Sequence, residues 1–262
     1  MRKVLFTIVC ALSFVSARAQ FYGITAGFTY TTAASYSESF ADFFQSYNAD
    51  NADDLSTPFD TVFGRMSGPG WAVSFFANLG GVDVRANSGV NYMSTTNRNE
   101  FKRGQSRELK FTTDDWFIDF GVGPGNEHYY FNFNIGMLLR MSSLYSSYMY
   151  PNGYRSYTTS FNLNGIYESW RLTGNLGATL GINVVENAQL VYRIDYVFDA
   201  TGDPTYRADF SDNQDFKTAP NSIIFPRDMN IYVNEIDLFN TVYHDFHGFR
   251  HSLTLQLSLF SE

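Results

Sequence analysis

The sequence contains one cluster of histidines, His244-Asp245-x-His247-x3-His251, close to its C-terminal end. Imidazoles and a carboxylate are ligands that a transition metal accepts, and a histidine beside a serine, as at His251-Ser252, suggests nucleophilic hydrolysis. Adjacent residues of a strand point to opposite faces, however, so His251 and Ser252 cannot share a hydrogen bond within one strand. We therefore interpret the cluster as interfacial histidines on a loop. A metal site formed by His244, His247 and His251 is the alternative.

A second group of candidate ligands is the acidic segment Asp50-Asn51-Ala52-Asp53-Asp54. The carboxylates of Asp50, Asp53 and Asp54 could bind calcium, which prefers oxygen ligands, although their spacing is not that of an EF-hand loop. Acidic surface segments are commonly only solvated. The sequence has no phosphate-binding glycine loop, nucleophile elbow or zinc-protease motif. We expect a protein that is not an enzyme and needs no cofactor, with loop calcium as the alternative.

Eight charged residues share a different pattern, because we expect each of them on the inward face of the predicted strands or of the residues next to them. They are Asp83, Arg85, Asp119, Arg140, Arg171, Arg193, Asp195 and Arg250. An unpaired buried ion costs several kcal/mol, so charges enclosed by strands must pair or remain hydrated. Five arginines and three aspartates nearly neutralise one another. We expect a salt-bridged plug inside a narrow barrel, and a gated pore or an active carboxylate is the alternative.

The segment that ends at Arg140 shows most clearly which element positions these charges. Between Tyr129 and Arg140, the odd-numbered residues are all apolar and the even-numbered residues are mostly small or polar. Successive side chains of a strand point to opposite faces, so this segment has one apolar and one polar face. Its length of about a dozen residues suits a tilted strand that crosses a bilayer. A strand of a soluble sandwich can alternate in the same way, so the rest of the chain must decide.

The N-terminal segment indicates export. Arg2 and Lys3 precede an apolar stretch over residues 4–15, and Ala17-Arg18-Ala19 is an A-x-A cleavage site. We predict a cleaved signal peptide over residues 1–19 and a single domain over residues 20–262. The one cysteine, Cys10, lies in the predicted signal peptide, so the mature chain has neither a disulfide nor a thiol nucleophile.

Composition and charge narrow the class of protein further. Without the three basic residues of the signal peptide, 15 basic residues stand against 26 acidic ones, a net charge of −11. This charge argues against nucleic acid or an anionic lipid surface as a partner. Aromatic residues make up 18% of the chain, yet the sequence has no stretch of about 18 apolar residues that could form a transmembrane helix. These features together favour an outer-membrane β-barrel.

The pattern of the whole chain predicts an all-β, antiparallel up-and-down transmembrane β-barrel of eight strands, with alternately long and short connections. The predicted strands are 22–30, 71–79, 82–92, 109–120, 129–140, 170–180, 190–198 and 253–259. Apolar residues change parity between Phe111 and Trp116, which predicts a bulge near Asp114-Asp115. The predicted long connections are a polar segment 31–68, a basic loop 98–107, a Tyr/Ser-rich loop 142–165, and segment 201–247 with an extra hairpin at 230–240.

Large aromatic residues recur at one end of the predicted strands. Trp71, Trp116 and Trp170 lie near the starts of even-numbered strands; Tyr30, Tyr92 and Phe198 end odd-numbered strands. Amphipathic rings prefer the membrane–water interface, so we predict that these residues form a girdle at the outer surface. Aromatic residues scattered through a sandwich core would not share this register.

With its signal peptide, alternating strands, girdle and amphipathic C-terminal strand ending near Phe260, the chain resembles the small outer-membrane β-barrel (porin-like) family of Gram-negative bacteria. This resemblance is architectural and implies an integral protein of the cell outer membrane, in contact with outer-membrane lipid. The long external loops are rich in Phe and Tyr, so we expect non-enzymatic binding of a partner, either another outer-membrane protein or a surface ligand. A narrow channel for small solutes and a lipid-modifying barrel enzyme are the alternatives.

Overall fold

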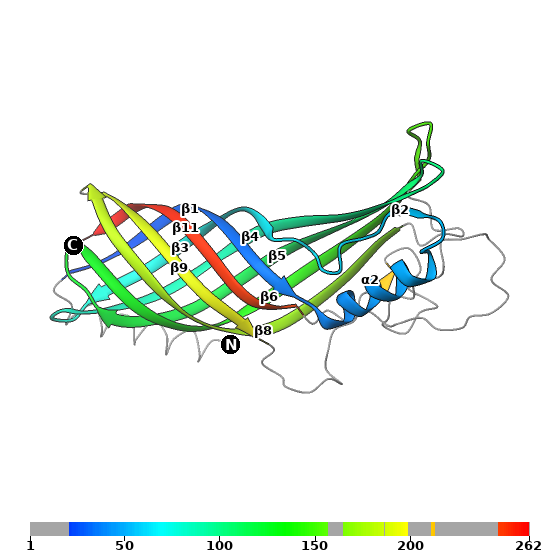
Figure 1. Ribbon diagram of the computed structural model, residues 1–262. Helices are drawn as coiled ribbons and strands as arrows, with labels where there is room; N and C mark the ends of the chain where they lie inside the picture. Colours follow the sequence, from blue (N-terminus) through cyan, green and yellow to red (C-terminus); the bar gives the residue numbers. More distant parts are fainter. Residues whose placement is uncertain (1–20, 157–164, 186, 199–210, 213–245, 262) are drawn as a thin grey trace.

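Eight strands form a closed antiparallel barrel in the computed structural model, which describes residues 21–156, 165–185, 187–198, 211–212 and 246–261 (Figure 1). The barrel strands are β1 (Phe21–Tyr36), β3 (Met66–Asn78), β4 (Val82–Phe101), β5 (Ser106–Pro124), β6 (Tyr129–Met149), β8 (Gly165–Val185), β9 (Ala188–Phe198) and β11 (His247–Ser261). Each pairs with the next barrel strand along the chain, and β11 pairs with β1. The predicted fold class and the predicted strand number are therefore confirmed.

The two faces of the barrel are inverted relative to those of a soluble protein. Large apolar side chains such as Phe133 (65% exposed) and Leu259 (67% exposed) cover the outside, whereas Asp119 and Arg250 are buried inside. Lipid is the environment in which an apolar outer belt is favourable, so this is the surface of a membrane-spanning barrel.

No helix in the described part of the chain is long and apolar enough to cross a membrane.

The connections at one end of the barrel are short, as predicted. Strand β3 ends at Asn78 and β4 begins at Val82, and the N–H of Leu79 donates to the carbonyl of Val82 (2.7 Å). Gly80 and Gly81 between them have positive φ angles of 67° and 93°. Such angles favour glycine and give the tight turn a twist that matches the strands.

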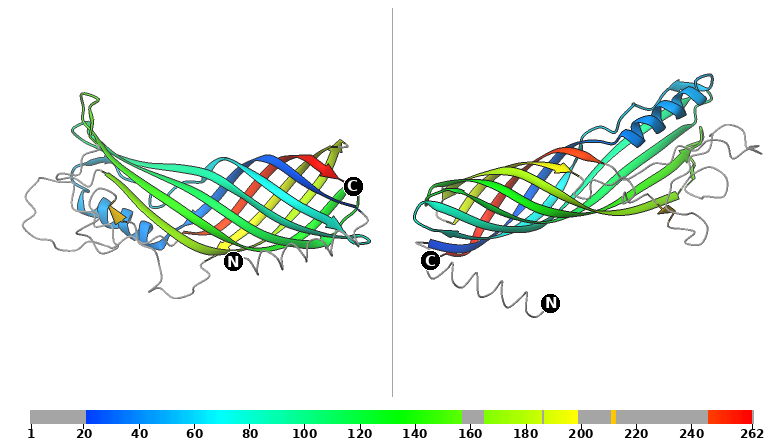
Figure 2. Two further views of the ribbon diagram at one scale, coloured as in Figure 1. Left: turned by 180° about the vertical axis from the view of Figure 1, so that it is seen from behind. Right: turned by 90° about the horizontal axis from the view of Figure 1, so that it is seen from below.

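At the opposite end, four strands continue beyond the others as a projecting sheet (Figures 1 and 2). Strands β4, β5, β6 and β8 have 20, 19, 21 and 21 residues, whereas β9 has 11. The prediction of a basic loop over residues 98–107 is therefore wrong: Arg98 lies in β4, Arg107 lies in β5, and only residues 102–105 connect them. The loop predicted from Ser142 also begins too early, because β6 continues to Met149.

The predicted bulge near Asp114-Asp115 is absent from β5, which is a described strand with continuous register on both sides. Asp114 pairs with Tyr92 of β4, and Asp115 pairs with Arg140 of β6, without a shift. The apolar residues change parity because they belong to different faces. Phe111 is buried on the inner face, whereas Trp116 is exposed on the outer face.

The first long connection holds a helix, α2 (Glu38–Asp50), and a short strand, β2 (Leu55–Thr57), which pairs with the end of β4. Ser37 caps the helix by accepting a hydrogen bond from the N–H of Phe40. One face of α2 is strongly apolar, so the prediction that residues 31–68 form a polar segment is wrong for this helix. Two further short strands, β7 (Arg155–Ser156) and β10 (Ser211–Asp212), pair with β6 and β8. The predicted hairpin at 230–240 lies outside the described residues.

Candidate functional site

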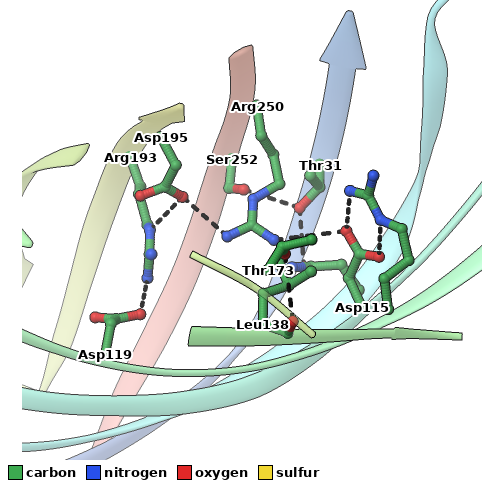
Figure 3. Close-up of polar contacts among 11 residues, drawn as sticks. Thr31, Asp115, Asp119, Leu138, Thr173, Arg193, Asp195, Arg250 and Ser252 are labelled. Atoms are coloured by element: carbon green, nitrogen blue, oxygen red, sulfur yellow. Dashed lines mark hydrogen bonds and ion pairs between the residues drawn. The ribbon is translucent and has the colours of Figure 1, made fainter. Parts of the chain in front are cut away.

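Arginine and aspartate side chains from several strands meet in the middle of the lumen (Figure 3). Arg193 Nε donates to Asp195 Oδ2 (2.6 Å), and its Nη1 donates to Asp119 Oδ2 (2.5 Å). Arg250 of β11 donates from Nη2 to the same Asp195 oxygen (3.0 Å). Both guanidinium groups also face the ring of Phe117, with centroid distances of 5.0 and 5.6 Å. One carboxylate oxygen thus holds two arginines together.

A second ion pair in the lumen has the bidentate geometry that is strongest for arginine and carboxylate. Arg140 Nε and Nη2 donate to the two oxygens of Asp115, each at 2.8 Å. Asp115 is also 3.7 Å from Arg250 Nη1, so the two ion-pair groups are continuous. Asp115 was not among the predicted lumen charges, because a bulge at Asp114-Asp115 would have changed the face on which it lies. Asp115 and Asp119 are four residues apart, so regular strand alternation without a bulge would have placed both side chains on the inner face.

The lumen is closed again near the short-turn end by Asp83 and Arg85 of β4. Arg85 donates to both oxygens of Asp83 (2.8 and 3.3 Å), and Asn132 donates to Asp83 as well (2.6 Å). The guanidinium of Arg85 lies 3.4 Å from the centroid of Tyr130 and 4.8 Å from that of Phe76. This stacking between two aromatic rings fixes the cation across the lumen.

Arg171 of β8 is the last of the eight predicted charges, and it pairs in register with Arg140. All eight are buried. Between the two charged layers lies a cavity of about 30 Å³. Such a space holds one or two waters rather than a continuous column.

Above the charged lumen, α2 packs against the inner face of the projecting sheet through a cluster of buried apolar residues, which we call the aromatic platform. Its members are Ala33, Phe40, Phe43, Phe44, Tyr47, Phe59, Phe63, Met66, Met93, Leu109, Phe111, Leu144 and Phe246. Aromatic rings dominate it, and the rings of Phe111 and Phe246 lie 4.4 Å apart. Residues far apart in the sequence are thereby joined into one small core at this end of the barrel.

Two asparagines fix the returning chain of the first long connection. Asn48 of α2 accepts a hydrogen bond from the N–H of Phe59 (2.9 Å) and donates to its carbonyl (2.8 Å). Asn97 of β4 forms the same double contact with the next residue, Asp60 (3.1 and 2.8 Å). Each side chain makes the pair of hydrogen bonds that a neighbouring backbone would make, so the returning chain is fixed to α2 and to the inner face of β4.

The predicted metal ligands do not come together in the described ranges, where no three His, Asp or Glu side chains are grouped as a metal site would require. His247 and His251 are on one face of β11, about 13 Å apart along the strand, and His251 Nδ1 lies 2.8 Å from the hydroxyl of Tyr192. Ser252 is buried on the opposite face, as expected for neighbours in a strand. His244 lies outside the described residues.

The acidic segment lies at the C-terminal end of α2, where Asp50 and Asp53 are exposed. Its main chain docks on the turn between β4 and β5. Lys102 Nζ donates to the carbonyl of Asp53 (2.6 Å), and the Lys102 N–H donates to the carbonyl of Asp54 (2.8 Å). Lys102 thus occupies two main-chain carbonyls of the segment, and the predicted calcium site at the carboxylates of Asp50, Asp53 and Asp54 stays a prediction.

The predicted girdle residues lie on the outward face of the barrel. Trp71, Tyr92, Trp116 and Trp170 are all exposed, as is Tyr30, and Phe198 is partly exposed. The rings of Trp71 and Trp116 meet edge to face, 6.4 Å apart. On β5 the outward residues below Trp116 are Ile118 and Phe120, and those above it are polar, so the ring marks the edge of the apolar belt.

No known protein-family pattern matches the chain, and no curated protein matches it. Two solved structures of Ail, the attachment invasion locus protein of Yersinia pestis, are similar in architecture. One, in complex with the heparin analogue sucrose octasulfate, has 9% identity and a TM-score of 0.37 over 91% of this chain and 98% of that one. The other has 10% identity and a TM-score of 0.39 over the same shares. The fold assignment rests on the strand topology and the inverted faces: the chain has the architecture of a small outer-membrane β-barrel.

Proposed function

We propose that this protein is a non-enzymatic integral outer-membrane β-barrel that presents a rigid extracellular surface to a binding partner. The partner is another outer-membrane protein or a surface ligand. In this proposal residues 1–19 are the cleaved export signal, the barrel over residues 20–262 is a single domain, and the projecting sheet faces the cell exterior. The aromatic platform is the observation that carries the proposal.

A connection that served only to join β1 to β3 would need few residues and no core of its own. Here α2 instead buries Phe40, Phe43 and Phe44 against the sheet. Full burial of one phenylalanine contributes about 1.5–3 kcal/mol, so three of them hold the helix firmly. A surface whose backbone is fixed before binding loses little conformational entropy when a partner arrives.

The outward face of the projecting sheet is polar and wide enough for such a contact. Beyond Tyr92, β4 presents Ser94, Thr96, Arg98 and Glu100 to solvent. From Tyr92 to the end of β4 is about 30 Å along the strand. Ion pairs cross this face, including Arg155 with Glu108 (2.9 Å). A polar, hydrogen-bonding surface of this kind suits a reversible extracellular contact rather than burial in lipid.

The filled lumen supports this proposal over the alternative of a channel. Bidentate ion pairs lie across it at two levels, and the cavity between them has a volume of about 30 Å³, which favours a lumen filled by side chains. An enzyme would need an exposed constellation of acid, base or nucleophile. Among the described residues, His251 and Ser252 instead lie on opposite faces of β11, with the barrel wall between their side chains.

Orientation can be tested with single cysteines, because the mature chain has none. We expect a membrane-impermeant maleimide to label Thr96→Cys and Lys110→Cys on intact cells. Glu127→Cys, at the short-turn end, is the matched control and should react only after the outer membrane is permeabilised. Labelling of Glu127→Cys alone on intact cells would refute the proposed orientation.

Binding can be tested in the same positions with a photo-crosslinking amino acid. We expect a discrete adduct from position 96 or 110 in living cells, and no such adduct from lipid-facing position 120. The adduct should weaken when Phe44→Ala loosens the platform. Equal crosslinking patterns at positions 96, 110 and 120 would contradict partner binding on this surface.

A further inference from the structure

At the short-turn end of the barrel, the neighbouring strands share one level. The N–H of Gly125 donates to the carbonyl of Gly81 (2.9 Å), which joins the turn after β5 to the turn after β3. The N–H of Asn183, near the end of β8, donates to the carbonyl of His128 in the turn before β6 (2.8 Å). A difference in the height of the apolar outer belt between these strands therefore appears at the opposite end of the barrel.

The belt does differ in height from strand to strand. Outward residues are apolar over 116–124 on β5 and over 129–141 on β6, and they are apolar or glycine over 170–184 on β8. Each residue rises about 2.5 Å along the axis of a barrel whose strands tilt by about 40°. The belt is therefore about 20 Å tall on β5, about 30 Å on β6 and about 35 Å on β8, whereas the apolar band of such a barrel is about 25 Å tall.

Four side chains at the far end of the belt form the excess height, and we call them the β6–β8 patch. Leu139 and Met141 of β6 pair with Leu172 and Trp170 of β8, where the two strands run side by side into the projecting sheet (Figure 1). All four point outward and are 37–67% exposed. Their neighbour on β5 is Asp114, which pairs with Met141. The belt has thus already ended on β5 at the level where it continues on β6 and β8.

We propose that the β6–β8 patch is the contact surface for a second copy of this chain. Apolar side chains that stand in water above the lipid favour burial against another apolar surface. A two-fold rotation about the membrane normal keeps both copies in the same orientation and brings the same patch of each to the same height. The surface is regular, because β6 and β8 pair from Tyr129 to Ser146 without a shift in register.

Lipid alone is a poorer cover for this patch. A bilayer that thickened beside β6 and β8 only would need about 10 Å more hydrocarbon there. A barrel tilted toward that side would lower the patch into lipid, but it would push the opposite end of β8 out of the membrane. Val184 and Val185, at that end, are 62% and 63% exposed, so the tilt would move apolar surface into water rather than remove it.

This inference is independent of the proposed partner contact. That contact is on the outward face of β4 and β5, at positions such as Thr96 and Lys110, whereas the patch is on β6 and β8 nearer the membrane. Either can fail while the other holds.

Single cysteines test the contact in native outer membranes, because the mature chain has no other cysteine. With a short bis-maleimide, Met141→Cys and Leu172→Cys should each give an adduct with the mass of two copies. Phe249→Cys, at an outward position of β11 that is 53% exposed, is the matched control and should remain monomeric. The proposal is overturned if positions 141 and 172 give no two-copy adduct, or if all three positions give it in equal yield, as random collision would.

A charge substitution distinguishes a protein neighbour from lipid. Met141→Glu combined with Trp170→Glu should abolish the two-copy adduct of Leu172→Cys, while the folded band on unboiled SDS gels is retained. Thr112→Glu, on the polar outward face of β5, is the matched control and should leave the adduct as it is. Loss of the folded band in the double glutamate variant would show that lipid covers the patch. An adduct with a different protein in place of the two-copy adduct would likewise refute a second copy as the occupant.

Discussion

Replacing Phe44 by alanine is expected to release α2 from the projecting sheet while the barrel stays closed. Phe44 is fully buried, and its ring lies 5.2–6.1 Å from the rings of its four aromatic neighbours. These neighbours are Phe40, Phe43, Phe59 and Phe63. Truncating a buried phenylalanine to alanine costs about 3–5 kcal/mol. At 1.36 kcal/mol for each factor of ten, the population of the undocked helix should rise about 10²- to 5 × 10³-fold.

The loss should be local, because the barrel is held by continuous strand pairing that Phe44 does not enter. Hydrogen exchange of the amides of α2, measured in detergent micelles, reports this opening directly. We expect exchange in α2 to accelerate about 10²- to 5 × 10³-fold in Phe44→Ala, with exchange in the strands that pair within the barrel unchanged. Gln45→Ala is the matched control, since Gln45 is the adjacent, exposed position of the same helix. It should leave exchange as in the wild type.

Two results would refute this reasoning. If exchange in α2 changed less than about threefold, the aromatic platform would contribute far less than a buried phenylalanine normally does. If the barrel strands lost protection together with α2, the platform and barrel would form one cooperative unit. In that case the aromatic platform could not be treated as a separate support for the proposed partner binding.

Two further predictions concern the lumen. Arg140→Ala should destabilise the barrel by about 3–5 kcal/mol, because it leaves the buried carboxylate of Asp115 without its bidentate partner; the double variant with Asp115→Ala should cost less than the sum of the two single ones. The destabilisation is measured as the fall in the temperature at which the folded, faster-migrating band is lost on SDS gels. If the falls for the two single variants add up to that of the double variant, Arg140 and Asp115 are not directly coupled. The wild-type protein should also give no discrete conductance steps in planar bilayers, and regular steps would show that the two charged layers open.

Strand alternation was sufficient to predict much of the fold, because lipid outside and a narrow lumen inside impose opposite chemistry on successive residues. The segment from Tyr129 to Arg140 is the clearest case, with Phe133 exposed and Arg140 buried as its pattern indicates. The same alternation identified Arg193 and Asp195, which are two residues apart on the inner face of β9 and form an ion pair. Which charges pair across the lumen could not be predicted, since partners such as Arg193 and Asp119 are 74 positions apart and depend on barrel tilt.

The aromatic platform could not be predicted for a different physical reason. Its parts come from the first long connection, five strands and the segment before β11, and each part alone is too short to bury its apolar face. A usable signal was nevertheless present. In α2, Phe40, Phe43, Phe44 and Tyr47 follow the spacing of one helix face after the N-cap Ser37, a pattern typical of an amphipathic helix.

Strand β5 shows how both faces of one strand report the membrane boundary. On its outer face, residues change from apolar Phe120, Ile118 and Trp116 to polar Thr112 and Lys110. Its inner face changes in the opposite sense, from Asp119 and Asp115 in the lumen to Phe111 and Leu109 under α2.

Within the bilayer, lipid requires an apolar exterior, and the enclosed lumen can hold paired charges. Beyond it, water requires a polar exterior, so apolar groups move to the inner face and form a core there. A change of parity at constant register therefore marks where a barrel strand leaves the membrane. In this chain that point lies between Trp116 and Thr112, where the lumen charges end and the aromatic platform begins.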